Sequence, residues 1–370
     1  VTYGYAGKNQ FKPEYGIEIA ENVQSTDLFL NENGVQTELD GSNRKVEELR
    51  TELFASFVYS MNEKMTFEGG LTAEFSRVTV SGDVSNKINY QFLKPRLSSI
   101  YKMDKDTRLI VDAGRGVNQL ALDAFVANVQ TTDDIISAGN SNLAPEINDE
   151  LSVTYDWTFH ERGSLKVKVF NEWRTDILED IKLTEDQDTG DFTSGTGNAG
   201  DAQFYGVQTD INLPLDWILK NGLIEISHGY RKSSFDDPII DDERNVNGFI
   251  PRWLNFKFRQ DITEHQFAWG MDFWSDYLET GYRVGERITF GANNRLRVFV
   301  ETSQFFGLKT QLEIHHINTG EYTRSRFSYV RVRETDNTIV PGDRGDIYNG
   351  SEVASRKREP EIKLSIWGTF

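Results

Sequence analysis

The last ten residues of the chain, 361–370, alternate between two kinds of side chain. The apolar or small set is Ile362, Leu364, Ile366, Gly368 and Phe370, and the residues between them are mostly polar. A period of two is typical of a strand whose two faces meet different surroundings. Ten residues also match the roughly 9–11 that a tilted strand needs to cross a bilayer core, with an aromatic end at the interface. The segment therefore predicts either a strand of a membrane barrel or the closing strand of a soluble sheet.

The same two-faced pattern recurs along the chain. It is found in residues 48–61, 65–76, 151–160 and 308–316. Charged residues are too frequent on the less apolar face for a packed protein interior, so we expect that face to be in contact with water. An apolar face on lipid and a wet face on a lumen predict an all-β fold, a transmembrane antiparallel up-and-down β-barrel.

The links between the expected strands support the same architecture, because short and long links alternate. The short links are residues 61–64, 104–106, 160–163, 215–221, 263–265 and 305–307. The long links are residues 29–43, 81–87, 117–146, 184–201, 236–251, 283–293 and 319–360. Outer-membrane barrels have short periplasmic turns and longer extracellular loops. The chain then supplies about 14–15 strands, with residues 1–7 forming the lower part of the first.

Composition excludes several other classes of protein. Mean hydropathy is -0.53 and no apolar run approaches 18 residues, which excludes helical membrane spans. The net charge of -18 makes nucleic acid an unsuitable partner, because its phosphates would be repelled. The chain has no cysteine, so we expect neither disulfides nor thiolate metal sites.

The wet face carries charged and aromatic residues that are candidates for contact with a ligand. The predicted lumen-facing residues are Arg50, Glu52, Glu74, Asp156, Lys168, Arg252, Trp253, Lys257, Asp272 and Trp274. In a hollow barrel the charged groups hold an internal domain by ion pairs, contact an entering solute, or simply solvate the wall. The two tryptophans stack on a solute or pack against that internal domain.

Catalytic, cofactor and metal sites find little support in the sequence. The adjacent His315 and His316 point to opposite faces of a strand and so do not form one metal site. The acidic segment 236–243 lacks the ligand spacing and the turn glycine of a calcium loop. Residues 186–198 lack the lysine and the following helix of a phosphate-binding loop. We therefore predict no catalytic residues, no cofactor and no metal.

One motif resembles a known family. Residues 139–146 read Gly-Asn-Ser-Asn-Leu-Ala-Pro-Glu and precede the alternating segment 151–159. This resembles the segment of TonB-dependent outer-membrane receptors that enters a barrel strand from an extracellular loop. The motif residues are Asn140, Asn142, Leu143, Pro145 and Glu146, and the terminal Phe370 is similar to the family's aromatic C-terminus. Ser141 departs from the family's usual proline.

The resemblance implies a location, a set of partners and a function. Residues 1–370 would be the C-terminal portion of a barrel of about 22 strands in the bacterial outer membrane. By the same resemblance, the family's N-terminal plug domain would lie outside these residues, and TonB would act through that plug. The receptor would import a scarce solute, such as a ferric siderophore, cobalamin or an oligosaccharide, and would not be an enzyme. Two alternatives stay open: a passive porin of about 14–16 strands, and a soluble all-β lectin or adhesin.

Overall fold

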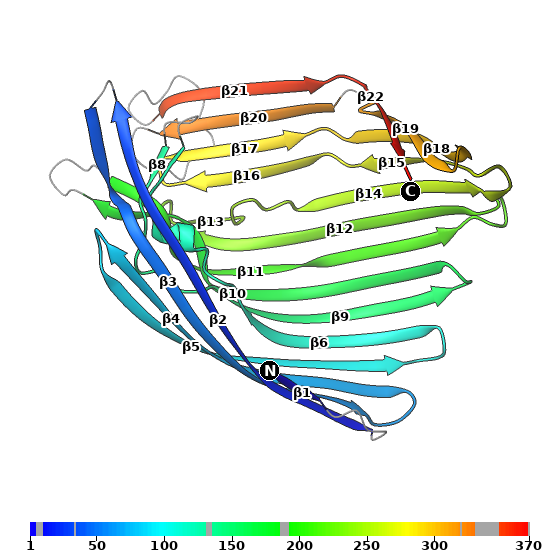
Figure 1. Ribbon diagram of the computed structural model, residues 1–370, viewed down its shortest axis with the longest axis horizontal. Coiled ribbons are helices and arrows are strands. Elements are labelled where there is room, and N and C mark those ends of the chain that lie inside the picture. Colours follow the sequence, from blue (N-terminus) through cyan, green and yellow to red (C-terminus); the bar gives the residue numbers. More distant parts are fainter. Residues whose placement is uncertain are drawn as a thin grey trace.

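The structure is a computed structural model that describes residues 1–4, 10–32, 35–130, 135–185, 192–318, 320–329 and 348–368. Its main feature is one 16-stranded antiparallel sheet, with strands paired in chain order (Figure 1). The strands are β1 (Thr2–Gly4), β2 (Phe11–Glu32), β3 (Val35–Ser60), β4 (Met65–Gly82), β5 (Asn86–Lys102), β6 (Thr107–Val117), β9 (Ile147–Phe159), β10 (Gly163–Glu185), β11 (Phe192–Pro214), β12 (Gly222–Asp237), β13 (Asp242–Arg244), β14 (Arg252–Ile262), β15 (Phe267–Trp274), β18 (Arg295–Phe305), β19 (Leu308–His315) and β22 (Glu361–Trp367). The predicted up-and-down antiparallel fold is therefore confirmed.

A second sheet of four strands continues one side of the first. It consists of β16 (Tyr277–Arg283), β17 (Glu286–Ala292), β20 (Gly320–Tyr329) and β21 (Tyr348–Arg358). The register of β15 with β18 carries over into β16 and β17, since Trp274 pairs with Arg295 and Tyr277 pairs with Ala292. The strands in Figure 1 thus run on past short breaks of the ladder.

The break between β19 and β20 contains two extra residues. From the Val298 and Ile314 pair to the Ala292 and Tyr322 pair, one strand advances six residues and the other eight. His316 lies in this bulge with a φ of 55°, a left-handed conformation that is uncommon for residues other than glycine. The bulge separates β19 from β20 and leaves space beside it on the polar face of the sheet.

Short turns lie at one end of the sheet and the longer connections at the other (Figure 1). The strands extend further at the second end than the sequence predicts. Residues 29–32 and 35–43 belong to strands, because β2 and β3 stay paired up to Glu32 and Val35. Residues 192–201 likewise belong to β11. The backbone ladder continues there without the apolar alternation that a bilayer imposes, so the sequence gives no strand signal.

The two faces of the sheet differ as the alternation predicts. On one face apolar side chains are exposed, with 48% of Leu53 and 56% of Val169 accessible. On the other face charged side chains are buried, and Glu74 is only 2% exposed. We call these the apolar face and the polar face. Among the described residues no helix is long and apolar enough to cross a membrane. The predicted terminal residue Phe370 lies outside the described residues.

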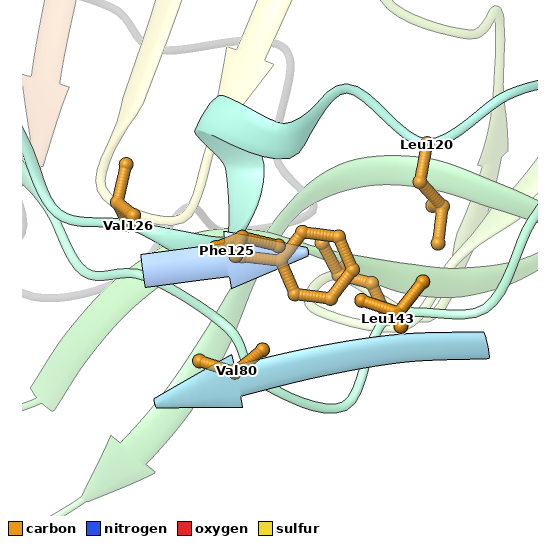
Figure 2. Packing of buried hydrophobic residues seen from close by; sticks show 7 residues of the cluster. Val80, Leu120, Phe125, Val126 and Leu143 are labelled. Atoms are coloured by element: carbon orange, nitrogen blue, oxygen red, sulfur yellow. The ribbon is translucent and has the colours of Figure 1, made fainter. Parts of the chain in front are cut away.

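The described part of the connection between β6 and β9, residues 118–130 and 135–146, packs on the polar face of the sheet. It contains a 3-10 turn, η1 (Leu122–Phe125), and a small hairpin of β7 (Asn128–Gln130) and β8 (Ile135–Ser137). Phe125 and Leu143 are fully buried against valines of β3 and β4 (Figure 2). The cluster is Val46, Val78, Val80, Leu120, Phe125, Val126 and Leu143. This apolar core fixes the connection to the wall.

Candidate functional site: the polar face and the mouth of the barrel

Three of the predicted lumen-facing residues meet around one lysine on β3, β4 and β5. Lys94 Nζ lies 2.8 Å from Glu52 Oε1 and 2.7 Å from Glu74 Oε2. Arg50 lies on the same face, 3.6 Å from Glu52. Glu74 is almost fully buried, so its charge depends on this lysine. The arrangement stiffens the wall across three strands.

Asp156 and Lys168 also face the lumen side and have partners on neighbouring strands. Asp156 of β9 pairs with Arg108 of β6. Lys168 of β10 lies 2.6 Å from Glu150 of β9. Both pairs are partly accessible to solvent, with side-chain exposures between 15% and 49%. They contribute little to stability and keep the wall polar.

Lys257 and Asp272 face each other across β14 and β15 but bind different partners. The two are direct neighbours in the register. Lys257 Nζ lies 4.0 Å from Glu225 of β12, whereas Asp272 pairs with Arg297 of β18. Arg297 in turn contacts Glu313 at 2.7 Å. Ion pairs therefore link charged side chains of neighbouring strands along the polar face.

The two predicted tryptophans lie on the polar face, each beneath an arginine. The Arg231 guanidinium lies 5.5 Å from the centre of the Trp253 ring. The Arg295 guanidinium lies 5.3 Å from the centre of the Trp274 ring. Such stacking holds both groups in place through the ring quadrupole. The sequence predicted the aromatic residues but not their basic partners, which come from adjacent strands.

Arg252 is the exception among the predicted residues. It pairs with Tyr230 and shares the apolar side of β14 with Leu254, because neighbours in a strand point to opposite faces. Its side chain is 70% exposed and lies 3.5 Å from Asp276. Grouping Arg252 with Trp253 on one face was therefore wrong.

The family-motif residues tie the connection 118–146 to the strands around it. Asn140 donates to the Thr196 carbonyl at 3.1 Å, and its own side chain accepts from the Asn142 amide at 2.9 Å. Asn142 accepts a hydrogen bond from Asn86 of β5 at 2.8 Å. Leu143 is fully buried in the cluster of Figure 2. The asparagines thus make turns and bridges that hydrophobic residues could not make.

The end of the motif is buried where the chain enters β9. Pro145 and Glu146 are both buried. Glu146 accepts a hydrogen bond from Asn118 at 2.9 Å and lies 3.3 Å from Arg174. Burial raises the pKa of this glutamate, which lies outside the strands, although Arg174 opposes the shift. One more residue, Asn198 of β11, brackets Ala144 by donating to its carbonyl and accepting from its amide.

A buried charge cluster, which we call the mouth cluster, lies beyond the apolar band at the end with the longer connections. Its members are Glu179, Asp237 and Arg244. Arg244 Nε donates to Asp237 at 2.5 Å and Arg244 Nη2 donates to Glu179 at 3.0 Å. The guanidinium lies between the rings of Phe235 and Tyr282. Burial raises the pKa of Glu179, and the attraction of Arg244 opposes the shift.

Hydrogen bonds of the mouth cluster and of residues next to it join three segments that are distant in sequence. The Asn247 amide donates to Glu179 at 2.9 Å, and the Asn247 side chain donates to the Tyr282 carbonyl at 2.9 Å. The Val284 amide donates to Asp180 at 2.9 Å. The upper part of β10 is thereby fixed to the segment after β13 and to the turn between β16 and β17.

A cavity of about 610 Å³ opens beside the mouth cluster. Its wall combines carboxylates, arginines and aromatic rings from β10, β16, β17 and β20 with the side-chain amide of Asn247 from the segment after β13. The lining residues that can engage a solute include Asp180, Asn247, Glu279, Tyr282, Arg283 and Arg324. Cavities of this volume, with a few polar groups on an otherwise mixed wall, are typical of small-molecule sites.

Sequence reasoning missed the mouth cluster. The acidic segment 236–243 was interpreted as a solvated loop, but Asp237 is only 1% exposed and pairs with Arg244. The local signal was the short distance between Asp237 and Arg244 along the chain, whereas Glu179 gives no such signal. Within the described ranges no group of three His, Cys, Asp or Glu side chains is arranged to hold a metal. Residues 186–191 of the glycine-rich segment lie outside the described residues, and the rest is strand β11.

A family model described as "TonB dependent receptor-like, beta-barrel" matches residues 2–351. Curated protein sequences give no match. Solved structures with the same fold include the copper transporter OprC, with 10% identity and a TM-score of 0.66 over 99% of this chain and 55% of that one.

Two further matched structures are a transporter and a receptor. One is the FrpB iron transporter from Neisseria meningitidis, with 11% identity and a TM-score of 0.61 over 96% of this chain and 54% of that one. The other is the siderophore receptor PirA from Acinetobacter baumannii, with 12% identity and a TM-score of 0.57 over 86% of this chain and 49% of that one. The chain therefore spans about half the length of the structures it matches.

Proposed function

The chain belongs to the TonB-dependent receptor-like β-barrel family, and from that premise we propose that it forms the wall and the ligand-capturing mouth of a receptor that imports a scarce small solute. As a barrel of this family it lies in the bacterial outer membrane. The matched proteins are transporters and receptors of iron, copper and siderophores. The family match favours this function over the porin and the lectin or adhesin.

The domain organisation is part of the proposal. Because the chain spans about half of each matched structure, we propose that residues 1–370 are the C-terminal portion of a larger barrel. The receptor then contains a plug domain that occupies the lumen, and TonB acts on that plug to release the solute. The ion-paired polar face, with groups such as Lys94 and Glu52, offers that plug a hydrophilic surface.

One observation carries the proposed function: the 610 Å³ cavity at the mouth, which presents charges of both signs together with Tyr282. A solute that arrives from outside meets this cavity before it reaches the lumen. The cavity belongs to a rigid arrangement, since hydrogen bonds of Glu179 and Asp180 fix the upper part of β10 to two of the connections around it. Preorganised walls of this kind bind small molecules without a large entropic cost.

The test is solute accumulation by cells that carry or lack the full-length gene. Ferric siderophores, cobalamin, oligosaccharides and copper ions are offered in turn at limiting concentration. We expect deletion to abolish uptake of one class, and we expect that uptake to stop when TonB is deleted or a protonophore is added. The variants Glu279→Gln and Arg324→Gln should reduce the same uptake while the barrel remains heat-modifiable on a gel. Uptake that persists without TonB would show a passive channel instead.

A further inference from the structure

A second cavity, of about 320 Å³, lies on the polar face where the 16-stranded sheet meets the four-stranded sheet. It occupies the space beside the two-residue bulge at His316, between β15, β18 and the strands that follow. Its charged and aromatic lining consists of Trp274, Arg295, Arg297, Arg358, Glu361 and Lys363, in addition to the two adjacent histidines. Four cations thus surround one small cavity in a chain whose net charge is -18.

Two of these cations are already neutralised by carboxylates. Arg297 pairs with Asp272 and lies 2.7 Å from Glu313. Lys363 Nζ lies 3.8 Å from Glu313. The side chain of Glu313 is only 5% exposed, so its carboxylate interacts with these two cations and little with solvent. The charges of Arg297 and Lys363 are thus balanced by Asp272 and Glu313, and the other charged residues of the lining are Arg295, Arg358 and Glu361.

Arg295 and Arg358 differ, because aromatic groups rather than carboxylates hold them. Arg295 lies over Trp274 at 5.3 Å and its Nη1 donates to the Tyr322 hydroxyl at 3.4 Å. Arg358 lies over the Tyr322 ring at 4.5 Å. In the part of the chain that the structure describes, neither guanidinium has a carboxylate oxygen within 4.0 Å. Most of their five N–H donors therefore remain available.

Other arginines on the polar face show what these two lack. Arg108 pairs with Asp156, and Arg259 lies 2.8 Å from Asp261 and 3.0 Å from Glu301. A guanidinium that is stacked and oriented but not neutralised is a preorganised site for an oxyanion, because its planar fork matches two oxygens. Two such groups on one cavity give a local positive potential inside an acidic protein.

We propose that this cavity binds an organic oxyanion, a carboxylate or phosphate group carried by the solute that the receptor takes up. Arg295 and Arg358 bind the anionic oxygens, and Trp274 and Tyr322 hold the two guanidiniums in place. The volume of the cavity exceeds that of a bare oxyanion and accommodates part of the group that carries it. This inference rests on the proposed function and adds a chemical class to it.

The test measures binding of phenyl phosphate to the receptor, expressed with all of its natural sequence and purified in detergent. Tryptophan fluorescence and isothermal titration are the two readouts. We expect Arg295→Gln and Arg358→Gln each to weaken binding about tenfold, since each removes a charge-assisted hydrogen bond. The matched control is Arg259→Gln, which removes a neutralised arginine from the same face and should change the affinity less than twofold. Heat-modifiability on a gel verifies that each variant is a folded barrel.

The ligands also separate the proposal from weaker explanations. Benzyl alcohol, which has the ring without the charge, should bind at least tenfold more weakly than phenyl phosphate. Inorganic phosphate that binds as tightly as phenyl phosphate would overturn the assignment to an organic solute. Equal phenyl phosphate affinities in the native protein and the two variants would overturn the site. That result would leave TonB-dependent uptake intact, whereas loss of the uptake dependence on TonB would refute the proposed function and not the binding.

Discussion

The substitution Arg244→Met tests whether the mouth cluster holds the extracellular connections together. Methionine keeps much of the side-chain length between Phe235 and Tyr282 but removes the positive charge. Glu179 and Asp237, whose side chains are 4% and 1% exposed, then lose their shared partner. Removing one member of a buried ion pair costs about 3–5 kcal/mol, because the remaining charge is left in a poorly polarisable site. The low exposure means that solvent does not screen this cost.

Amide hydrogen exchange measures the effect where it occurs. The reporters are the backbone amides of Asn247 and Val284, which donate to Glu179 and Asp180. A loss of about 3–5 kcal/mol in local opening free energy accelerates their exchange by about one hundred to several thousand fold. The control is Arg115→Met, which breaks an ion pair with Asp149 that is about half exposed and is worth about 0.2–1 kcal/mol.

The stability difference between the Arg244→Met variant and the native protein should depend on pH in a definite direction. Burial raises the pKa of Glu179 above its ordinary value, and the attraction of Arg244 opposes that shift. In the Arg244→Met variant the opposition is gone, so the folded state takes up a proton more readily. A carboxyl whose folded pKa is raised gains stability as the pH falls through that pKa. The difference between variant and native protein should therefore shrink from pH 7.5 to pH 5.5.

Two outcomes decide the matter. Exchange at the two reporter amides within threefold of the native rate would refute the reasoning. The double variant Arg244→Met with Glu179→Gln should recover part of the lost protection, since a neutral amide is less costly to bury than an unpaired carboxylate.

Three further changes have definite expected outcomes. Phe125→Ala should lower the free energy of unfolding by about 3–5 kcal/mol and make residues 118–146 sensitive to protease, because it empties the core of Figure 2. Lys94→Met should destabilise the wall by about 3–5 kcal/mol in urea titrations, and Lys94→Met with Glu74→Gln should cost less, because Glu74 is no longer an unpaired buried charge. The ion pair with Arg162 and a hydrogen bond from a backbone amide hold the pKa of Asp216 below its ordinary value. The carboxylate therefore stabilises its turn at pH values above the unfolded-state pKa, and this stabilisation is lost as the pH falls through the folded-state pKa. An NMR titration in which the pKa of Asp216 is unshifted would contradict this.

Local pattern predicted the antiparallel strands and their two faces, but not how far the strands extend. The alternation around Leu53 and Glu52 predicted which residue faces each environment, and the register confirms it. The motif residues Asn140 and Asn142 were also identified, although their partners were not. Arg252 shows that a charged side chain alone does not predict the face on which a residue lies. Its neighbour Trp253 lies on the polar face, so Arg252 lies on the apolar face.

The sequence by itself determined the period-two strands, the alternation of short and long links, and the family motif, because each of these depends only on residues that are close together along the chain. The tertiary structure alone decided which charges remain unneutralised and which are buried. Arg244 meets Glu179 across 65 residues, and Arg295 stacks on Trp274 of an adjacent strand with no carboxylate oxygen of the described residues within 4.0 Å. Such pairings depend on register, bulges and the folding back of connections over many residues. No local pattern encodes them, because the free energy of each contact depends on atoms that are brought together only when the sheet has formed.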